Sequence, residues 1–265
     1  MPILVQDVID MLTAPVETTV PDSVDQLIHG DPHAVVRGIA VTFMATQQAL
    51  EQASRLGANL IISHEGLFYR HRHSTPILVE EPVYAAKKRF IEERDLAVYR
   101  FHDGVHRYRP DGIMEGLIRQ LGWESFVNEH LSAASIVHLP RSTAGEIAAH
   151  VKQSLGIGCL RTVGDLTTAC ERVGLLAGCR GGGDLAIPLF EKHKLDLILY
   201  GEGPEWETPE YVRDAVGMGQ GKALLVLGHL ESEQPGMKLF ADRLRGMLPD
   251  VPVFFIPVNP VFQVV

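Results

Sequence analysis

Residues 58–66 read Ala-Asn-Leu-Ile-Ile-Ser-His-Glu-Gly, a continuous apolar run followed at once by a histidine, a carboxylate and a glycine. An apolar run without polar alternation predicts a strand covered on both faces, as in a parallel sheet. An apolar run that ends in a histidine occurs twice more: residues 96–101 precede His102, and residues 223–228 precede His229. Such side chains at the carboxyl ends of parallel strands open onto the ligand crevice of an α/β protein.

The rest of the chain alternates apolar runs with segments whose apolar positions recur at helical spacing. Strands are predicted at 35–41, 59–63, 96–101, 131–139, 173–178, 195–200, 223–227 and 251–256. Helices are predicted at 1–14, 46–56, 81–94, 111–121, 143–155, 184–193, 209–216 and 235–248. Thr143 and Glu146 have the spacing of a capping box at the start of one of these helices. The predicted fold class is therefore α/β, with mostly parallel sheets covered by helices.

Laid side by side, the two halves of the chain match element for element. The strand before His64 corresponds to the one before Glu202, and the strand before His102 corresponds to the one before His229. We therefore expect two similar α/β domains from a pseudo-duplication, with residues 1–125 forming the N-terminal and residues 126–265 the C-terminal domain. A chance alternation of strands and helices is the alternative.

Composition narrows the class of protein. With 46% hydrophobic and 22% charged residues, the chain of 265 residues is typical of a globular protein with a substantial core. The net charge of −9 argues against general nucleic-acid binding, because phosphate contacts need a basic face. Cys159, Cys170 and Cys179 lack metal-finger spacing, so they are expected to be thiols in a reducing compartment. The chain shows no basic leader and no long apolar span, so we expect a cytoplasmic protein without a membrane partner.

Imidazole and carboxylate groups gather at three predicted strand ends, and they are the usual nitrogen and oxygen ligands of divalent metals. Each group alone also has an ordinary explanation, such as a solvated turn residue, a helix cap, or a first-turn glutamate favoured by the helix dipole. Three groups at equivalent places together predict a metal site. The groups are His64 with Glu65, His102 with Asp103 and His106, and His229 with Glu233.

Two further segments have weaker signals. Gly181, Gly182 and Gly183 follow a predicted strand and open a helix, so their N–H groups could cradle an anion, although a flexible turn explains them equally well. Arg70 and Arg72 belong to the run Arg-His-Arg-His that ends at residue 73, which could hold a phosphate or form a solvated charged loop.

At these residues the chain resembles the Nif-three-like family (NGG-one interacting factor three), whose members are often called GTP cyclohydrolase 1 type 2 homologues. The matching segments are 39–53, 59–68, 102–106, 179–184, 196–202 and 228–236. The resemblance implies two similar α/β domains, a pair of divalent metals in the cleft between them, and toroidal hexamers built from trimers.

Carried over residue by residue, the resemblance implies the metal ligands His64, Glu65, His102, His106, His229 and Glu233. Two positions depart from the family pattern, since a histidine has become Glu65 and an aspartate has become His106. Without His102, the five remaining ligands are still three imidazoles and two carboxylates, so the exchange keeps the ligand inventory. If the lost aspartate bridged two metals, Glu65, Glu233 or Asp103 must replace it, or the site holds one metal.

Two functions follow as hypotheses. The first is a metal-dependent hydrolase acting on a small nucleotide-like or phosphorylated substrate. Glu202 or Asp103 would be the proton carrier, and the glycine loop or Arg70 and Arg72 would contact the phosphate. The second is a non-catalytic regulatory or metal-handling protein. Either needs one or two divalent ions per chain (Zn, Fe or Mn), and the resemblance implies a homo-oligomer, a hexamer.

Overall fold

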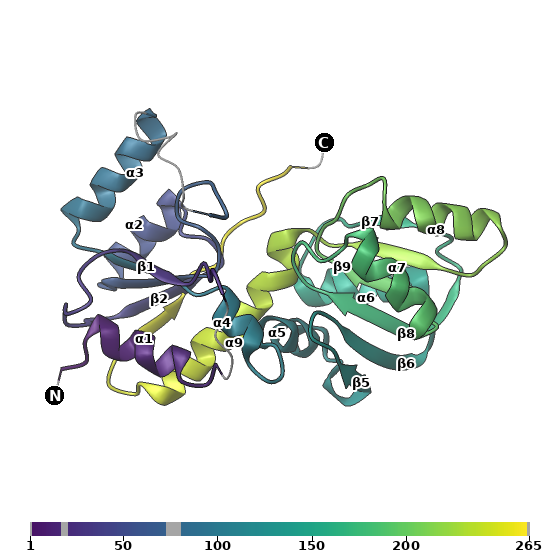
Figure 1. Ribbon diagram of the computed structural model, residues 1–265, viewed down its shortest axis with the longest axis horizontal. Helices are drawn as coiled ribbons and strands as arrows, with labels where there is room; N and C mark the ends of the chain where they lie inside the picture. Colours follow the sequence, from purple (N-terminus) through teal and green to yellow (C-terminus); the bar gives the residue numbers. More distant parts are fainter. Residues whose placement is uncertain (1, 17–20, 73–80, 264–265) are drawn as a thin grey trace. The chain divides into compact units, whose positions relative to one another are not determined.

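The computed structural model describes residues 2–16, 21–72 and 81–263. Two compact units divide the chain: unit 1 comprises Met1–Gly112 with Met237–Asn259, and unit 2 comprises Ile113–Gly236 with Pro260–Val265. Over the described ranges there are nine α-helices and two sheets, so the protein is a mixed α/β protein (Figure 1). The division into residues 1–125 and 126–265 stays a prediction. Within the described part, no helix is both long and apolar enough to span a bilayer.

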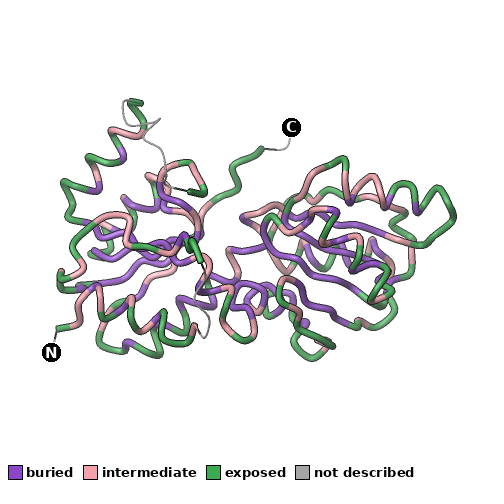
Figure 2. The backbone as a smooth tube through the Cα atoms, viewed as in Figure 1, coloured by how far each residue is buried: buried purple, intermediate pink, exposed green. Residues whose placement is uncertain are grey.

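Unit 1 is built on a five-stranded sheet in the order β1-β4-β3-β2-β11. The strands are β1 Gln26–His29, β2 Ile39–Thr42, β3 Leu60–Ser63, β4 Ala97–Arg100 and β11 Val253–Phe255. The pairs β4–β3, β3–β2 and β2–β11 are parallel, whereas β1 is antiparallel to β4. Because Ser63 lies opposite Arg100, the segments leaving β3 and β4 start side by side. All residues of β2, β3 and β4 are buried, as the purple tube of Figure 2 shows.

Helices cover both faces of this sheet, which explains the continuous apolar runs. In Figure 1, α2 and α3 lie on one side of the sheet and α1 on the other. On the first side, Leu50 of α2 and Ile91 of α3 pack in one core cluster with Ile61 and Val98. The helices are α1 Val5–Thr13, α2 Gln47–Arg55, α3 Pro82–Glu93 and α4 Asp103–Arg107, while α5 Gly112–Leu121 and α9 His229–Met247 contain residues of both units.

Unit 2 is built on a six-stranded sheet in the order β5-β6-β8-β9-β10-β7. Its strands are β5 Val127–His130, β6 Ser135–Thr143, β7 Arg161–Val163, β8 Ala169–Leu176, β9 Leu197–Tyr200 and β10 Ala223–Val226. Its helices are η1 Glu124–Phe126, α6 Ala144–Leu155, α7 Gly183–Lys192 and α8 Thr208–Gly217. The pairs β8–β9 and β9–β10 are parallel, and the outer pairs are antiparallel.

The two sheets share a four-strand arrangement. In unit 1 the order β1-β4-β3-β2 has a parallel centre and an antiparallel edge strand, and β7-β10-β9-β8 has the same order and directions in unit 2. The sheets differ at their other edges, where β11 is parallel to β2 but β6 is antiparallel to β8. The elements paired in the sequence comparison thus occupy equivalent places in their sheets.

The predicted helices and central strands are confirmed, with corrections at the periphery. The helix predicted at 235–248 begins at His229, because Pro235 lies inside α9 rather than at its start. The strand predicted at 131–139 runs over Ser135–Thr143, since Leu131 and Ala134 close the turn before it. The sequence pattern did not predict β1, β5, β7 and α4. These elements are short, and the three strands have only exposed or half-exposed residues, so their apolar patterns are weak.

Candidate metal centre

His64 is the first residue after β3 and is fully buried. The preceding Ser63 shapes the turn, because its hydroxyl accepts the N–H of Ala45 at 3.2 Å and donates to the Glu65 carbonyl at 2.7 Å. These two hydrogen bonds fix the turn after β3, and His64 is buried within that turn.

His102 and His106 come from the end of β4, where His102 is the N-cap of the short helix α4 and His106 lies within that helix. Asp25 caps this helix, since its carboxylate accepts the N–H groups of His102, Asp103 and Gly104 at 2.6–2.8 Å. A Cβ atom on Gly104 would lie 2.8 Å from Asp25 Oδ2 and 2.3 Å from the Phe101 ring, so the cap needs glycine there. One helical turn separates the two histidines, which brings them to the same side of α4.

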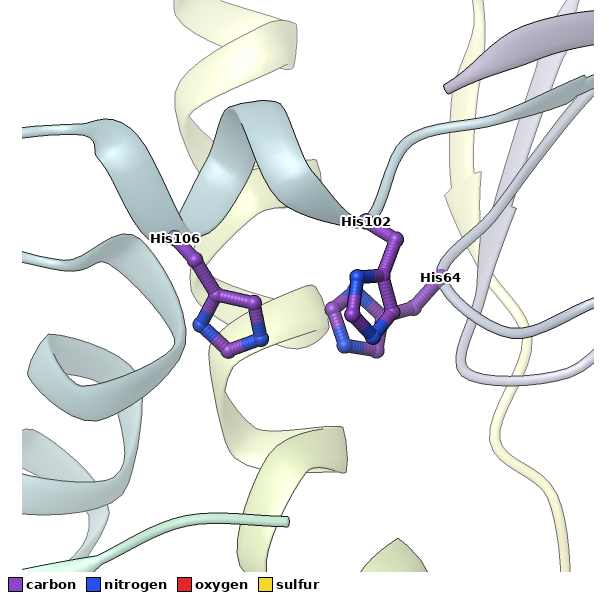
Figure 3. Close-up of side chains that lie close together, drawn as sticks. All are labelled: His64, His102 and His106. Atoms are coloured by element: carbon purple, nitrogen blue, oxygen red, sulfur yellow. The ribbon is translucent and has the colours of Figure 1, made fainter. Parts of the chain in front are cut away.

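The three imidazoles lie against one another in unit 1, as Figure 3 shows. The ring centroids of His64 and His102 are 4.5 Å apart in a stacked arrangement, and the His106 centroid lies 5.1 and 5.2 Å from these two. One ring nitrogen from each of the three lies within 4.8 Å of the others. The side chains of His102 and His106 are 16% and 10% exposed, so the cluster is largely desolvated.

Each of these rings has its Nδ1 anchored on an oxygen that can only accept. The acceptors are the Phe101 carbonyl for His64 at 3.3 Å, the Asp103 carboxylate for His102 at 2.9 Å, and the Asp111 carboxylate for His106 at 3.0 Å. In the neutral ring the proton therefore lies on Nδ1, and Nε2 holds the lone pair. Histidines that ligate metals have this outer hydrogen bond almost without exception. The donor set fits a divalent transition metal such as zinc or iron.

Asp103, predicted as a proton carrier, lies in this centre with both carboxylate oxygens engaged. Oδ1 binds His102, and Oδ2 accepts the N–H of Val24 and the hydroxyl of Ser23, both at 3.0 Å. The hydrogen bond from His102, followed by those from Val24 and Ser23, holds the pKa of Asp103 well below its usual range against the opposing effect of burial.

Glu65 leaves the same turn as His64 but faces a cation. Its Oε2 atom lies 3.0 Å from Nη2 of Arg100, a β4 residue that is completely buried. The Arg100 guanidinium also donates to the His64 carbonyl at 3.2 Å and to the His71 carbonyl, and its Nη2 lies 3.1 Å from His71 Nδ1. Glu65, His71 and His102 form a second group whose potential ligand atoms lie within 4.8 Å of one another.

In unit 2, His229 lies between two carboxylates. Its Nδ1 is 2.9 Å from Glu202 Oε1, and its Nε2 is 3.0 Å from Glu233 Oε2 one turn later in α9. Gly178 of the β8–α7 loop packs directly against the Glu233 carboxylate, since a Cβ added to this glycine would lie 2.1 Å from Glu233 Oε1. Glu202, predicted as a proton carrier, thus contacts His229 as Asp103 contacts His102.

In the glycine loop predicted to cradle an anion, two of the three amides bind groups of the chain itself. Gly181 donates to the Glu202 carbonyl at 3.0 Å, and Gly183 donates to the Glu207 carboxylate at 2.6 Å. An anion at the start of α7 would have to displace Glu207. Arg70 is half-buried and Arg72 exposed, while residue 73 lies outside the described residues.

Within each unit, the structure brings several of the site candidates together. Unit 1 brings together His64, Glu65, His102, Asp103 and His106, and unit 2 brings together Glu202, His229 and Glu233. The sequence pattern did not single out Asp25, Arg100 and Asp111. Two of these residues could have been found from the sequence, since Arg100 is a charge inside the apolar run 96–101 and Asp111 follows His106 by five residues. No local feature of the sequence indicates Asp25.

Fold and centre together define a mixed α/β protein with a buried histidine cluster suited to a divalent metal. The profile of the Duf34/NIF3 family (NGG1p interacting factor 3) matches residues 3–261, so the chain belongs to this family.

Curated relatives share the name GTP cyclohydrolase 1 type 2 homolog. The relative from Clostridium perfringens is 26% identical over 238 residues, which cover 87% of this chain and 86% of the relative. The one from Escherichia coli K12 is 28% identical over 231 residues, covering 85% and 86%.

Among solved structures, Staphylococcus aureus hypothetical protein SA1388 superimposes with a TM-score of 0.78 at 17% identity, over 100% of both chains. A Bacillus cereus protein related to NIF3 gives 0.75 at 15% identity, again over 100% of both chains. These similarities support the fold.

Proposed function

We propose that this protein is a metal-dependent hydrolase acting on a small nucleotide-like or phosphorylated substrate, and that His64, His102 and His106 hold its divalent ion. The observation that carries the proposal is the set of three adjacent imidazoles whose Nδ1 atoms are all anchored on oxygen acceptors. The hydrolase part is supported by the cyclohydrolase name of the curated relatives.

When bound, a divalent ion supplies Lewis-acid polarisation of a phosphoryl or carbonyl group and activation of water. The chain's own residues prepare for it. Asp103 and Asp111 fix the tautomer of His102 and His106 and raise the basicity of their Nε2 atoms, which makes these atoms stronger metal ligands. Burial of His64 keeps bulk water from competing for the cluster.

We also carry over from the sequence resemblance that His229 and Glu233 serve the same centre, in a cleft between two duplicated domains. The shared strand order of the two sheets supports the duplication. The contact of Glu202 with His229 Nδ1 supports a ligand role for His229, because it repeats the carboxylate–histidine pairs of unit 1. The proposal also includes one or two divalent ions per chain, a homohexamer and a small-molecule substrate.

Metal titration tests the ligand assignment. Metal-stripped protein should bind Zn²⁺, Mn²⁺ or Fe²⁺, and His106→Ala should weaken binding by at least about 100-fold, because a direct ligand is lost. His138→Ala is the matched control, since His138 is an exposed residue of β6. Equal affinities of the His106→Ala and His138→Ala variants would contradict the assignment.

A non-catalytic metal-handling function is the second candidate, and one observation favours it. Both predicted proton carriers, Asp103 and Glu202, are engaged by histidine rings. A panel of nucleotides and phosphate esters, incubated with the metal-loaded protein, separates the two functions. Turnover that disappears in His106→Ala supports the hydrolase, and its absence across the panel with metal bound supports metal handling.

A further inference from the structure

Arg100 holds the ligand groups of the second candidate position in unit 1, which consists of Glu65, His71 and His102. We infer that the Arg100 guanidinium takes the place of a second cation there, so that the unit 1 centre holds one divalent ion on His64, His102 and His106. This inference rests on the proposed metal function and adds a determinant of metal number.

His71 directs its lone pair at this guanidinium. Arg100 Nη2 lies 3.1 Å from His71 Nδ1, and because a guanidinium has no acceptor, the Nδ1 atom must accept. In the neutral His71 ring the proton then lies on Nε2. This is the reverse of the arrangement in His64, His102 and His106, whose Nδ1 atoms carry the proton.

Glu65 is held by the same cation. Its Oε2 atom is 3.0 Å from Arg100, and its Oε1 atom is 3.7 Å from His102 Nε2. A carboxylate bridges two metals through its two oxygens, and here one of them already has a cationic partner. The ion pair also neutralises the negative charge that would otherwise favour a second metal.

Arg100 cannot withdraw from this position easily. It is the last residue of β4, lies opposite Ser63 in the parallel pair with β3, and its side chain is 0% exposed. Its other donors bind the carbonyls of His64 and His71, so both ends of the turn that carries Glu65 are attached to it. A divalent ion bound to Glu65 and His71 would lie beside this buried positive charge and be repelled.

The test counts metal ions per chain by mass spectrometry after equilibration with excess Zn²⁺ and removal of the unbound metal. His71→Ala should bind as many ions as the wild type, with affinity within about threefold, far from the 10–100-fold effects of losing a metal-site residue. His138→Ala is again the control. A count one ion lower in His71→Ala would overturn the inference.

Arg100→Gln provides the converse measurement. Removal of the cation should raise the count by one ion per chain, and the double variant Arg100→Gln/His71→Ala should return to the wild-type count. A folded Arg100→Gln protein, checked by circular dichroism, with an unchanged count would overturn the inference. If Arg100→Gln does not fold, the His71→Ala result decides alone. A wild type that binds no ion would instead overturn the proposed metal function, and this inference with it.

Discussion

At the scale of single residues, the carboxylates that bind Nδ1 of His102 and His106 offer the most specific test of the proposed metal centre. Asp111 binds His106 Nδ1 at 3.0 Å and is itself 8% exposed. We predict that Asp111→Asn lowers metal affinity about 10–100-fold, because a neutral amide neither fixes the tautomer nor raises the basicity of Nε2. Competition with a chromogenic chelator measures this.

Asp165→Asn is the control for that substitution, since Asp165 is an exposed carboxylate that binds Thr167 in unit 2. Equal affinities of the Asp111→Asn and Asp165→Asn proteins would mean that the hydrogen bond to His106 has no role in metal binding.

Lys87 of α3 predicts a dependence of stability on pH. It is 4% exposed and donates to the Leu67 carbonyl at 2.7 Å, and burial lowers its pKa from about 10.5 to about 8. Between these values the unfolded chain keeps a proton that the folded chain has released. The free energy of unfolding therefore rises from pH 8 towards 10.5, by up to ~3 kcal/mol from this group.

Denaturant unfolding at several pH values checks this expectation. Lys87→Met should remove the rise, whereas Lys88→Met should keep it, because Lys88 is half-exposed in a surface pair with Glu92. A rise that persists unchanged in Lys87→Met would assign it to other groups.

At the residue level, the local sequence pointed to the histidines, and their role as metal ligands stays a prediction. His64, His102 and His106 stand beside their strand ends in the sequence, and the structure brings them together. The contacts that hold them were harder to predict, because Asp25 is far from α4 in the sequence and Arg100 resembles an ordinary strand-end charge. Which groups a buried cation binds depends on tertiary packing.

At the scale of elements, the β8–α7 loop approaches the start of α9 so closely that only glycine fits. Gly178 has φ of +69°, donates to Ser232 Oγ at 2.9 Å, and leaves no room for a Cβ beside Glu233. We predict that Gly178→Ala destabilises the protein by about 2–4 kcal/mol, from left-handed strain plus the displacement of Glu233.

Gly219→Ala is a matched control, because Gly219 has φ of +79° and a Cβ added there would meet nothing within 4 Å. It should show only the backbone strain, about 1 kcal/mol. Thermal unfolding compares them, and equal losses in both variants would refute the close contact.

Element boundaries were predictable where chain-local signals exist. The capping box of Thr143 and Glu146 is present at the start of α6, as its spacing predicted. The start of α9 was mispredicted, because Pro235 favours the first turn of a helix but is accommodated here inside one. Short edge strands such as β7 depend on pairing with a neighbour, which the local sequence does not encode.

At the scale of the whole molecule, the mixed α/β class and the family were predictable because buried parallel strands and their terminal histidines leave a strong pattern. The antiparallel edges that complete both sheets were not, since their residues are polar or half-exposed. The sequence pattern also did not predict that residues 237–259 belong to unit 1. This assignment depends on the pairing of the three-residue strand β11 with β2, which lies far away in the sequence.

Anomalous scattering from crystals grown with Zn²⁺ tests the central claim most directly. We predict a peak at about 2.0–2.2 Å from Nε2 of His64, His102 and His106. An anomalous map from fully zinc-loaded protein, with no peak at these three nitrogens, would contradict it.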